Sequence, residues 1–582
     1  MADNVLDALR GVPNPKGRAI RYLDLAELDF ADAQPDFITH AELQARVTAL
    51  ANAFRALAGH DAPVVTILAP STIDGLVALL AAEVAGAAHP VNWLLDADGI
   101  ADCMNAVGAD LVVTPGARPG LDTHDKLMAA LPRVPSLRGV ISTGRVGQGE
   151  HSLRALIAGQ PGDRLLGRVP GPDDVAALFH TAATTGTSKV VPLSHANLLA
   201  AAEGIAEAWH MDDETRIVNA LPFFHVAGAN LLSLGPLCRG GEVLLLTEAG
   251  LRNPAVLARH WQIIEATRPT IIGGIPSSLV ALLDVPLNGA DISTVRFCAT
   301  GGAPMPAAAA AAFERQFGLP VHTIYGMTET AGLIATVRYE TVPEYGTAGR
   351  LAPGIKACVR PLDGGELTDE PDVTGIICVK GQQLFGGYLG AVETGASFLP
   401  DGWLETGDVG HISALGAVTI SGRGNDIIIR SGNNIDPSVI ETAANRFPGV
   451  AESAAIAMPD RYAGEVPALY VVPRAGKTVR PDELERHLRA HLAEPHARPA
   501  HIFVTPALPL TVVGKLSRVA LRRQAAAAAI RMALQEQGLQ PDLELDQTPD
   551  GKLLIRTGDR TCLSQVQGVV SSLGLHAEVA AA

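Results

Sequence analysis

Cysteine is scarce in this chain, and its few cysteines form no recognisable pattern. Only six occur among 582 residues: Cys103, Cys238, Cys298, Cys358, Cys378 and Cys562. They lie far apart, and none forms a C-x-x-C pair or a cluster with histidine. In a chain of this length, such spacing is typical of buried, reduced thiols in an intracellular protein rather than of a disulfide framework.

An excess of positive charge is also missing. The chain has 45 Lys and Arg against 61 Asp and Glu, which gives a formal net charge of −16. Bulk electrostatics therefore argue against nucleic acid or an anionic membrane surface as a partner. The same balance is compatible with ATP, because a local basic site can bind an anion within an acidic protein.

No stretch has the uninterrupted apolar character of a membrane span. The most apolar region, residues 64–91, is interrupted by Pro70, Asp74 and Glu83, which predicts a core strand followed by a helix. Residues 1–17 contain early acidic side chains and no apolar centre, unlike a secretory signal. We therefore expect a soluble cytoplasmic protein without a transmembrane segment.

What the chain does contain is a regular alternation of apolar, strand-like runs with helix-like segments. It is 47% hydrophobic and long enough for more than one domain. Apolar runs at 64–70, 109–116, 242–246, 270–276 and 294–302 predict parallel sheets covered by helices on both faces. The predicted class is therefore α/β, with a large N-terminal domain built on such sheets.

The later part of the chain has a different texture. From about residue 343, short strands separated by Gly and Pro predict a β-rich subdomain that completes the large domain, 1–423. Strand and helix patterns then restart, which predicts a small α+β C-terminal domain over 424–524. Residues 525–582 are predicted to form a helix and a small ββα-like tail of unknown role.

The most informative segment is residues 180–189, HTAATTGTSK. It directly follows the apolar run 175–179, which is typical of a buried strand. Hydroxylated side chains around a glycine, followed by a lysine, suit a phosphate, because backbone N–H groups approach closely, hydroxyls donate and the lysine supplies positive charge. A polar turn after a strand is the alternative. The segment is not a Walker A loop, which needs G-x-x-x-x-G-K-[ST].

Segment 180–189 resembles the phosphate loop of acyl- and aryl-CoA synthetases, the AMP-dependent adenylate-forming ligases. Six further segments resemble motifs of that family in the same order: LPFFHVAG (221–228), TGGAPM (300–305), YGMTE (325–329), GWLETGD (402–408), GRGNDIIIRSGNNIDPSVIE (422–441) and LPLTVVGKLSR (508–518). The resemblance covers roughly residues 36–523, and six ordered matches are hard to obtain by chance. It implies ATP, Mg²⁺ and CoA as cofactors, an AMP-binding large domain and a mobile small domain.

The resemblance assigns nucleotide contacts to a set of residues. They are Thr181, Thr184, Thr185, Gly186, Thr187, Lys189, Gly302, Ala303, Pro304, Tyr325, Gly326, Met327, Thr328, Asp408 and Arg423. It implies that Tyr325 stacks near the adenine and that Asp408 accepts hydrogen bonds from both ribose hydroxyls. Thr328 and Glu329 are implied to meet phosphate and Mg²⁺, with Glu329 as the metal ligand. From the residues alone, the alternative is that 325–329 forms a strand-to-helix turn and that Asp408 is an aspartate in an ordinary turn.

The implied catalytic residues are Lys515, Glu329, Thr328 and His225. Lys515 matches the lysine of the C-terminal motif, whose ammonium would stabilise charge on the α-phosphate. His225 is implied to gate the acyl pocket, although a histidine beside two phenylalanines can instead be a satisfied core residue. Asn425 occupies the family's hinge position, and Ser431 with Gly432 matches a loop that faces CoA.

The phosphate loop departs from the family pattern T-[SG]-G-T-T-G-x-P-K at three positions. Ala182 and Ala183 replace the usual Ser or Gly and Gly, and Ser188 replaces Pro. If position 183 needs a positive φ, alanine there costs about 1 kcal/mol. The departures predict weaker ATP binding or slow turnover, and they keep open a nucleotide- or acyl-binding protein with degraded catalysis.

The implied reaction joins a carboxylic acid to CoA through an acyl-AMP intermediate. The expected pocket segments 225–232, 273–276, 300–302 and 326–332 are small and apolar, with no Arg to pair a second carboxylate. We therefore expect a hydrophobic substrate, either fatty-acid-like or alicyclic. A ligase that passes the acyl group to a carrier protein or an amine stays an alternative. A homodimer stays open as the assembly.

Overall fold

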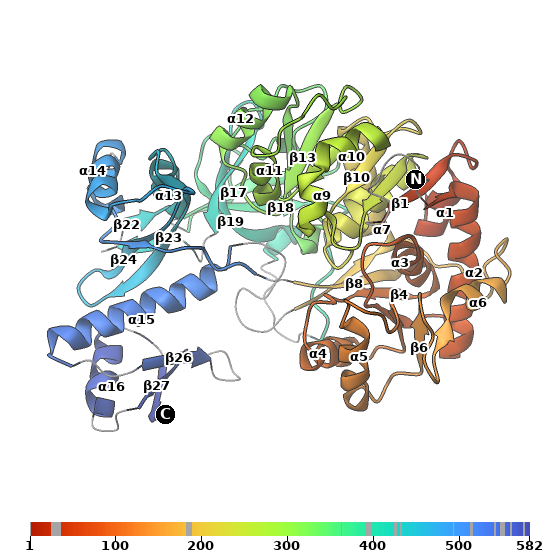
Figure 1. Cartoon of the computed structure of the whole chain (residues 1–582), viewed down its shortest axis with the longest axis horizontal. Helices are drawn as coiled ribbons and strands as arrows, with labels where there is room; N and C mark the ends of the chain where they lie inside the picture. Colours follow the sequence, from red (N-terminus) through yellow and green to blue (C-terminus); the bar gives the residue numbers. More distant parts are fainter. Residues whose placement is uncertain are drawn as a thin grey trace.

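The computed structural model in Figure 1 divides into a large region of sheets and helices and a smaller region, drawn in blue, beside it. It describes the chain except for residues 1, 25–35, 182–188, 363, 391–397, 424–425, 427, 431–432, 493, 512–515, 540–542, 548–552, 559–561, 574, 576 and 582. The α/β class with a smaller C-terminal domain, predicted from the sequence, is confirmed.

The first large sheet contains the two strands that lead into the motifs TGGAPM and YGMTE. Among the described residues it has nine strands in the order β16-β15-β14-β13-β12-β10-β11-β1-β2. Its strands are β1 (Arg18–Leu23), β2 (Asp36–Thr39), β10 (Arg216–Asn219), β11 (Glu242–Leu246), β12 (Ile271–Gly274), β13 (Phe297–Gly301), β14 (Val321–Tyr325), β15 (Ala335–Thr336) and β16 (Arg350–Leu351). From β14 through β1 the neighbours are parallel, so these strands end at one edge.

The second large sheet carries the phosphate-loop segment. Its described strands follow the order β7-β6-β5-β3-β4-β8-β9. They are β3 (Val64–Ile67), β4 (Ala87–Pro90), β5 (Leu111–Thr114), β6 (Gly139–Ser142), β7 (His151–Ser152), β8 (Val175–His180) and β9 (Val190–Ser194). All neighbours are parallel except β8 and β9, which run antiparallel on either side of the phosphate loop.

The apolar region 64–91 is internal to the protein. Its helix α3 (Ile73–Ala85) is buried from Gly75 to Ala85 and contacts β1 of the first sheet as well as β3, β4 and β8 of the second. A helix that packs on all sides needs apolar residues all round, which explains the composition. Within the described ranges, no helix combines the length and apolarity that a membrane crossing requires.

Other helices begin where the local sequence predicts. Thr39 caps α2 (His40–Ala58) in a capping box with Glu42, and α2 ends at Gly59 in the left-handed region. Ser194 caps α7 (His195–Ala208) in the same way with Asn197. The Asn197 amide also donates to the Leu384 carbonyl at 2.9 Å, which ties the end of β9 to a segment almost two hundred residues later.

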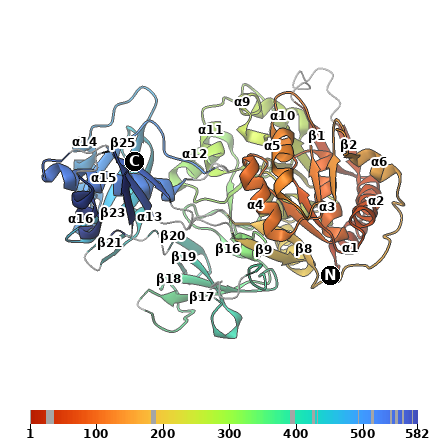
Figure 2. The same cartoon turned by 90° about the horizontal axis from the view of Figure 1, so that it is seen from below.

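The predicted β-rich subdomain is an antiparallel sheet in the order β17-β18-β19-β20 (Figure 2). Its strands are β17 (Lys356–Pro361), β18 (Gly375–Lys380), β19 (Leu404–Ile412) and β20 (Val418–Arg423). Val359, Ile377 and Val379 belong to the same hydrophobic cluster as the helices between the two large sheets. This shared core fixes β19, with Asp408, against the first sheet.

The small region contains a sheet of β21 (Ile428–Arg430), β22 (Asn433–Ile435), β23 (Val450–Asp460), β24 (Gly464–Pro473) and β25 (His501–Val504). The helices α13 (Pro437–Asn445) and α14 (Pro481–His491) pack with it. The helix α15 (Arg518–Glu536) contacts β23 and runs across residue 524, where the sequence predicted a boundary. The predicted mobility of this domain stays a prediction.

The tail contains one strand more than the predicted ββα unit. Its elements are β26 (Leu543–Gln547), β27 (Leu553–Thr557), α16 (Leu563–Ser572) and β28 (Ala577–Ala581). β28 pairs parallel with β27, while β26 and β27 form an antiparallel pair. Ile555 and Val566 share a hydrophobic cluster with Leu521 and Ile530 of α15, so the tail packs on the small domain through this helix.

Candidate active site

The adenine-loop and YGMTE motifs lie next to each other because β13 and β14 are parallel neighbours. Gly301 at the end of β13 is paired in register with Ile324, one residue before Tyr325 at the end of β14. The loop residues Gly302, Ala303 and Pro304 therefore leave the sheet beside Tyr325 and Gly326. Ligands of α/β proteins bind outside the carboxyl ends of parallel strands, which is where both motifs lie.

Gly326 allows the YGMTE segment to fold back on itself. A Cβ at this position would lie 2.1 Å from the carbonyl oxygen of Gly332, so only glycine fits. The turn is closed by hydrogen bonds from the Gly332 N–H to the Met327 carbonyl at 3.0 Å and from the Ile334 N–H to the Tyr325 carbonyl at 2.7 Å. Between them the 3₁₀ helix η5 (Thr328–Thr330) presents Thr328 and Glu329.

Tyr325 and Asp408 meet across 83 residues of sequence. The Tyr325 hydroxyl donates to Asp408 Oδ2 at 2.8 Å, and Asp408 is 6% exposed. Arg423 lies opposite Asp408 in the β19–β20 register. Three residues that the sequence assigns to the nucleotide are thus brought together from β14, β19 and β20. A carboxylate accepts hydrogen bonds only, so the group that the sequence assigns to the ribose hydroxyls is of the right chemical type.

Glu329 lies beside a tyrosine that the sequence analysis missed. Its side chain is 6% exposed, and its Oε1 accepts a hydrogen bond from the Tyr388 hydroxyl at 2.7 Å. The Lys189 ammonium lies 4.6 Å from the centroid of the same Tyr388 ring. Tyr388 stands in the run GGYLG, and tyrosine occurs only seven times in the chain, but neither signal indicates which residues it contacts.

The surroundings of Glu329 fit Mg²⁺ that is held mainly by phosphates. The part of the chain that the structure describes contains no group of three or more His, Cys, Asp or Glu arranged to hold a metal ion. Mg²⁺ usually keeps several waters and is bound through one or two carboxylates together with substrate phosphates. One buried carboxylate near a phosphate-loop lysine meets that requirement, so the donor set is compatible with Mg²⁺ bound to ATP.

The base of the phosphate loop is closed between β8 and β9. The Thr181 N–H donates to the Lys189 carbonyl at 2.9 Å, and the Lys189 N–H donates to Thr181 Oγ1 at 3.1 Å. Thr184, Thr185, Gly186 and Thr187 lie outside the described residues, as do the departures Ala182, Ala183 and Ser188. The described residues thus place the two ends of the loop, and the sequence assignments within it stay predictions.

The residue before the loop, His180, belongs to a buried polar chain. Its Nε2 lies 2.8 Å from His89 Nε2, and His89 Nδ1 lies 2.9 Å from Thr66 Oγ1. Burial lowers the pKa of His180 to about 4, so both rings can share one hydrogen bond as neutral imidazoles at physiological pH. At the base of the phosphate loop, His180 is therefore neutral and Lys189 supplies the positive charge.

His225 lies just before a π-helix. Its Nδ1 accepts a hydrogen bond from the Ala227 N–H at 3.3 Å, and its carbonyl accepts from the Ala229 N–H at 3.0 Å. The π-helix η3 (Ala227–Leu234) follows. Helices of this kind are rare and often occur at functional sites. The half-buried ring is therefore tied to the helix that opens the expected acyl pocket, and its gating role stays a prediction.

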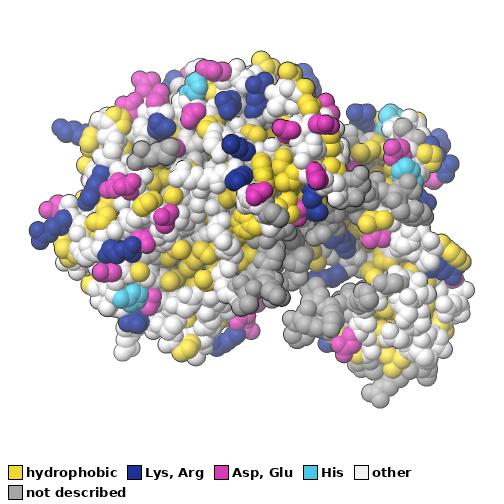
Figure 3. Space-filling model, turned by 180° about the vertical axis from the view of Figure 1, so that it is seen from behind, with side chains coloured by type: hydrophobic (Ala, Val, Ile, Leu, Met, Phe, Trp, Pro, Cys, Tyr) yellow, Lys and Arg dark blue, Asp and Glu magenta, His cyan; other side chains and the backbone are white. Residues whose placement is uncertain are grey.

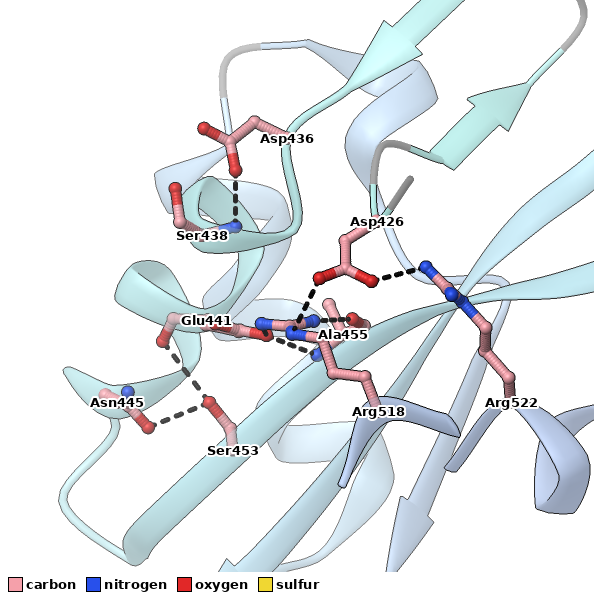
Figure 4. A network of polar contacts seen from close by, with 9 residues as sticks. All are labelled: Asp426, Asp436, Ser438, Glu441, Asn445, Ser453, Ala455, Arg518 and Arg522. Carbon is pink, nitrogen blue, oxygen red and sulfur yellow. Dashed lines mark hydrogen bonds and ion pairs between the residues drawn. The ribbon is translucent and has the colours of Figure 1, made fainter. Parts of the chain in front are cut away.

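The small domain places charged side chains around the predicted hinge. Lys515, Asn425, Ser431 and Gly432 lie outside the described residues. Figure 4 shows Asp426, next to the hinge position, held by Arg518 and Arg522 of α15. Arg518 also donates to Glu441 Oε1 at 2.8 Å and to the Ala455 carbonyl at 2.9 Å. We call Asp426, Glu441, Arg518 and Arg522 the hinge network.

The hinge network lies at one end of the segment that contains Lys515. Leu510 and Leu516 form an antiparallel bridge, and the Ser517 N–H donates to the Pro509 carbonyl at 2.8 Å. These contacts close the base of the lysine segment. Because α15 begins at Arg518, the network connects that base with the residue that follows the predicted hinge.

A cavity of about 690 Å³ lies away from these residues. It opens beside the ends of β1, β3, β5 and β6, and none of the residues that the sequence assigns to the site lines it. Its lining mixes Arg46, Arg118, Arg145 and Arg154 with Asp24, Asp36, Asp74 and Glu248. Arg118 pairs with Glu248, and Arg154 lies 3.7 Å from Asp74, so the charges are largely compensated. The motif residues, and not this cavity, therefore define the candidate site.

Comparison with known proteins agrees with this arrangement. Residues 18–389 match the family described as AMP-binding enzyme, and residues 439–515 match the AMP-binding enzyme C-terminal domain. A feruloyl-CoA synthase of Amycolatopsis sp is 32% identical over 491 residues, which cover 84% of this chain and 94% of that protein.

Two further proteins extend the match over nearly the whole length. A 3-[(3aS,4S,7aS)-7a-methyl-1,5-dioxo-octahydro-1H-inden-4-yl]propanoyl:CoA ligase of Mycobacterium tuberculosis is 31% identical over 528 residues, 89% of this chain and 99% of that one. The crystal structure of ATP-bound MatB from Rhodopseudomonas palustris has a TM-score of 0.79 at 27% identity and covers 90% of this chain and 99% of that chain. The chain therefore belongs to the AMP-binding enzyme family of adenylate-forming synthetases, as an AMP-forming acid–CoA ligase that uses ATP, Mg²⁺ and CoA.

Proposed function

We propose that this ligase activates a hydrophobic carboxylic acid, either fatty-acid-like or alicyclic, and transfers it to CoA. The observation that carries the proposal is the convergence of Tyr325, Asp408 and Glu329 at one edge of the sheets, beside an apolar pocket wall. In this proposal Asp408 accepts hydrogen bonds from the ribose hydroxyls, and Glu329 is a hard oxygen ligand for Mg²⁺.

The proposed reaction has two steps. In the first, a carboxylate oxygen of the substrate attacks the α-phosphorus of ATP, and the bond to pyrophosphate breaks. Asp408 holds the ribose, Tyr325 lies against the adenine, and Lys515 stabilises the charge that develops on the α-phosphate. Glu329 would hold Mg²⁺, which when bound would supply positive charge to the phosphates. In the second step, the CoA sulfur attacks the acyl carbonyl, its proton is lost to solvent, and AMP leaves.

The two-step reaction needs a change of position between the steps. We propose that the small domain turns about Asn425, so that Lys515 withdraws and the loop with Ser431 and Gly432 faces the CoA path. Large backbone changes at a few residues between elements are how hinged domains move. The hinge network supports this role, because it joins the residue after the hinge to α15 and to α13.

The walls expected around the acyl group are apolar and closely packed. The Asn230 amide of η3 donates to the Ala331 carbonyl at 3.1 Å, which joins segments 225–232 and 326–332. A Cβ on Gly332 would lie 3.3 Å from Leu231, and Ala229, Leu231 and Ala331 are buried. Among Asp, Glu, Lys and Arg, the four pocket segments contain Glu329 alone. Its negative charge would repel a second carboxylate on the substrate.

A panel of acids tests the proposal. Pyrophosphate release is measured with and without CoA for medium-chain, long-chain and alicyclic monocarboxylic acids, each paired with a dicarboxylic acid of equal length. We expect CoA-stimulated release and a kcat/KM about a hundredfold lower for each dicarboxylic acid, because a second charge would be buried without a partner. Release without CoA stimulation but with an amine or carrier thiol would favour the alternative acceptors. Binding of ATP without release would indicate degraded catalysis.

A further inference from the structure

Tyr388 contacts two side chains of opposite charge that the sequence assigns to the phosphate and the metal ion. The Lys189 ammonium lies 4.6 Å from the centre of its ring, and its hydroxyl donates to Glu329 Oε1 at 2.7 Å. The ammonium and the carboxylate thus both contact the tyrosine, one through the ring face and the other through the hydroxyl. Each interaction is with a neutral group, so neither charge is cancelled.

The backbone holds Tyr388 between the two motifs. The N–H of the next residue, Leu389, donates to the carbonyl of Val190, which directly follows Lys189, at 3.0 Å. The N–H of Phe385 donates to the carbonyl of Glu329 at 2.9 Å. The ring of Phe385 also packs edge-on against Tyr388, with 4.9 Å between the ring centres. Main-chain hydrogen bonds therefore anchor the segment 385–389 to Glu329 and to the residue that follows Lys189.

Without this ring, Lys189 and Glu329 would attract each other directly. The Glu329 side chain is almost fully buried, so an ion pair there would be screened less than one at the surface. Such a pair would compete with both ligands of the site, because the lysine would be engaged by carboxylate instead of phosphate. The carboxylate would in turn be engaged by ammonium instead of Mg²⁺.

We propose that Tyr388 is a positioning residue that keeps Lys189 available to the ATP phosphates and orients Glu329 toward Mg²⁺. Its ring supports the ammonium, and its hydroxyl occupies Oε1 so that Oε2 is presented to the metal. The proposal rests on the proposed function, since it takes ATP to be the ligand of this edge. It assigns two separable tasks to one side chain, and substitutions can remove them one at a time.

Tyr388→Phe removes the hydroxyl and keeps the ring. We expect metal-free ATP to bind this variant as it binds the parent protein, while the Mg²⁺ concentration for half-maximal pyrophosphate release rises about fivefold. Tyr388→Leu removes both groups. For this variant we expect metal-free ATP to bind about tenfold more weakly, because Lys189 then pairs with Glu329. AMP, which lacks the β- and γ-phosphates, should bind all variants equally.

A double variant distinguishes this role from a structural one. Glu329→Gln in the Tyr388→Leu background removes the carboxylate that would capture Lys189, so metal-free ATP binding should return to within about twofold of the parent. Binding is measured by isothermal titration calorimetry on the full-length protein, with chelator present for the metal-free arm. Tyr462→Leu, at an exposed ring that packs on Arg461, serves as the control for loss of a surface cation–π contact.

Three outcomes would overturn the proposal. Equal losses of AMP and ATP affinity in Tyr388→Leu would show that the ring only supports the fold. A Tyr388→Leu variant that Glu329→Gln does not rescue would show that no competing ion pair forms. A parent protein that binds no ATP would overturn the proposed function itself. This last result differs from the first two because it appears before any substitution is made.

Discussion

The nucleotide edge of the large domain and the hinge network of the small domain hold their carboxylates in different ways. At the nucleotide edge, Asp408 and Glu329 each accept a hydrogen bond from a neutral tyrosine, at 2.8 and 2.7 Å. In the hinge network, Asp426 and Glu441 pair with arginines of α15 (Figure 4).

The difference corresponds to two physical tasks. A carboxylate paired with an arginine has its charge compensated within the protein, so it holds elements together. Glu329, which accepts from the neutral Tyr388 hydroxyl, keeps its charge for a ligand. On the face drawn in Figure 3, the described acidic and basic side chains are interspersed over both regions. The contrast lies in the local partners.

The largest effect should come from removing the charge that the small domain is proposed to deliver. Lys515→Ala should lower acyl-AMP formation by about a thousandfold, because the charge on the α-phosphate loses its stabilising ammonium. Transfer of a supplied acyl-AMP to CoA should stay near the parental rate. Pyrophosphate release and acyl-CoA formation are measured in separate half-reactions. Equal losses in the two would contradict the assignment of Lys515 to the first step.

Glu83 extends the comparison to a carboxyl group deep in the large domain. Its Oε2 has no hydrogen-bond partner among the described residues, and burial raises its pKa to about 8. In the unfolded chain Glu83 loses its proton near its ordinary pKa of 4.5, whereas in the folded protein it keeps the proton up to about pH 8. The free energy of unfolding therefore falls as the pH rises from about 4.5 toward 8. Glu83→Gln stays neutral at every pH.

We therefore expect the free energy of unfolding of Glu83→Gln, relative to that of the parent protein, to be about 3 kcal/mol higher at pH 8 than at pH 5. The measurement is urea unfolding at several pH values. Glu207→Gln, at an exposed position of α7, is the matched control and should show no such pH-dependent gap. A constant difference between Glu83→Gln and the parent would mean that Glu83 is ionised in the folded protein.

Arg518→Met breaks the hinge network. It leaves Glu441, whose pKa burial raises, without its arginine, and should destabilise α13 and β23 locally by about 2 kcal/mol. Hydrogen–deuterium exchange of these two elements measures the loss. The double variant Arg518→Met with Glu441→Gln should recover part of it. Arg489→Met, which removes an exposed pair with Glu485 on α14, should change exchange by less than about 0.5 kcal/mol.

Asp408→Asn tests the nucleotide edge from the ribose side. Asparagine offers one carbonyl oxygen, which cannot serve both ribose hydroxyls and the Tyr325 hydroxyl, so the KM for ATP should rise about tenfold. The preference for ATP over 2′-deoxy-ATP should shrink in the same variant. If both proteins discriminate the two nucleotides equally, the carboxylate does not contact the ribose.

The smallest effect should come from the phosphate loop. Ala183→Gly combined with Ala182→Gly restores the glycine that the family uses there, and should lower the KM for ATP about fivefold if position 183 needs a positive φ. Steady-state kinetics with varied ATP measure the change. Unchanged kinetics would show that the alanines already support a competent loop.

Much of the fold could be predicted because its signals are local. The apolar run and helix at 64–91 predicted β3 and α3, and the turn-rich texture after residue 343 predicted the sheet β17–β20. The third strand of the tail, β28, was missed as a pairing element because its pairing with β27 depends on how α16 crosses over, which no local pattern records.

The sequence by itself determined the class of the protein, its family and the order of its motifs, because strand periodicity and motif spacing are properties of neighbouring residues. Only the tertiary structure decided which side chains meet. It joined Tyr325 to Asp408 over 83 residues and placed Tyr388 between Lys189 and Glu329. These contacts depend on strand order and on a core shared by the first sheet and the β-rich subdomain, and both arise only when remote segments pack together.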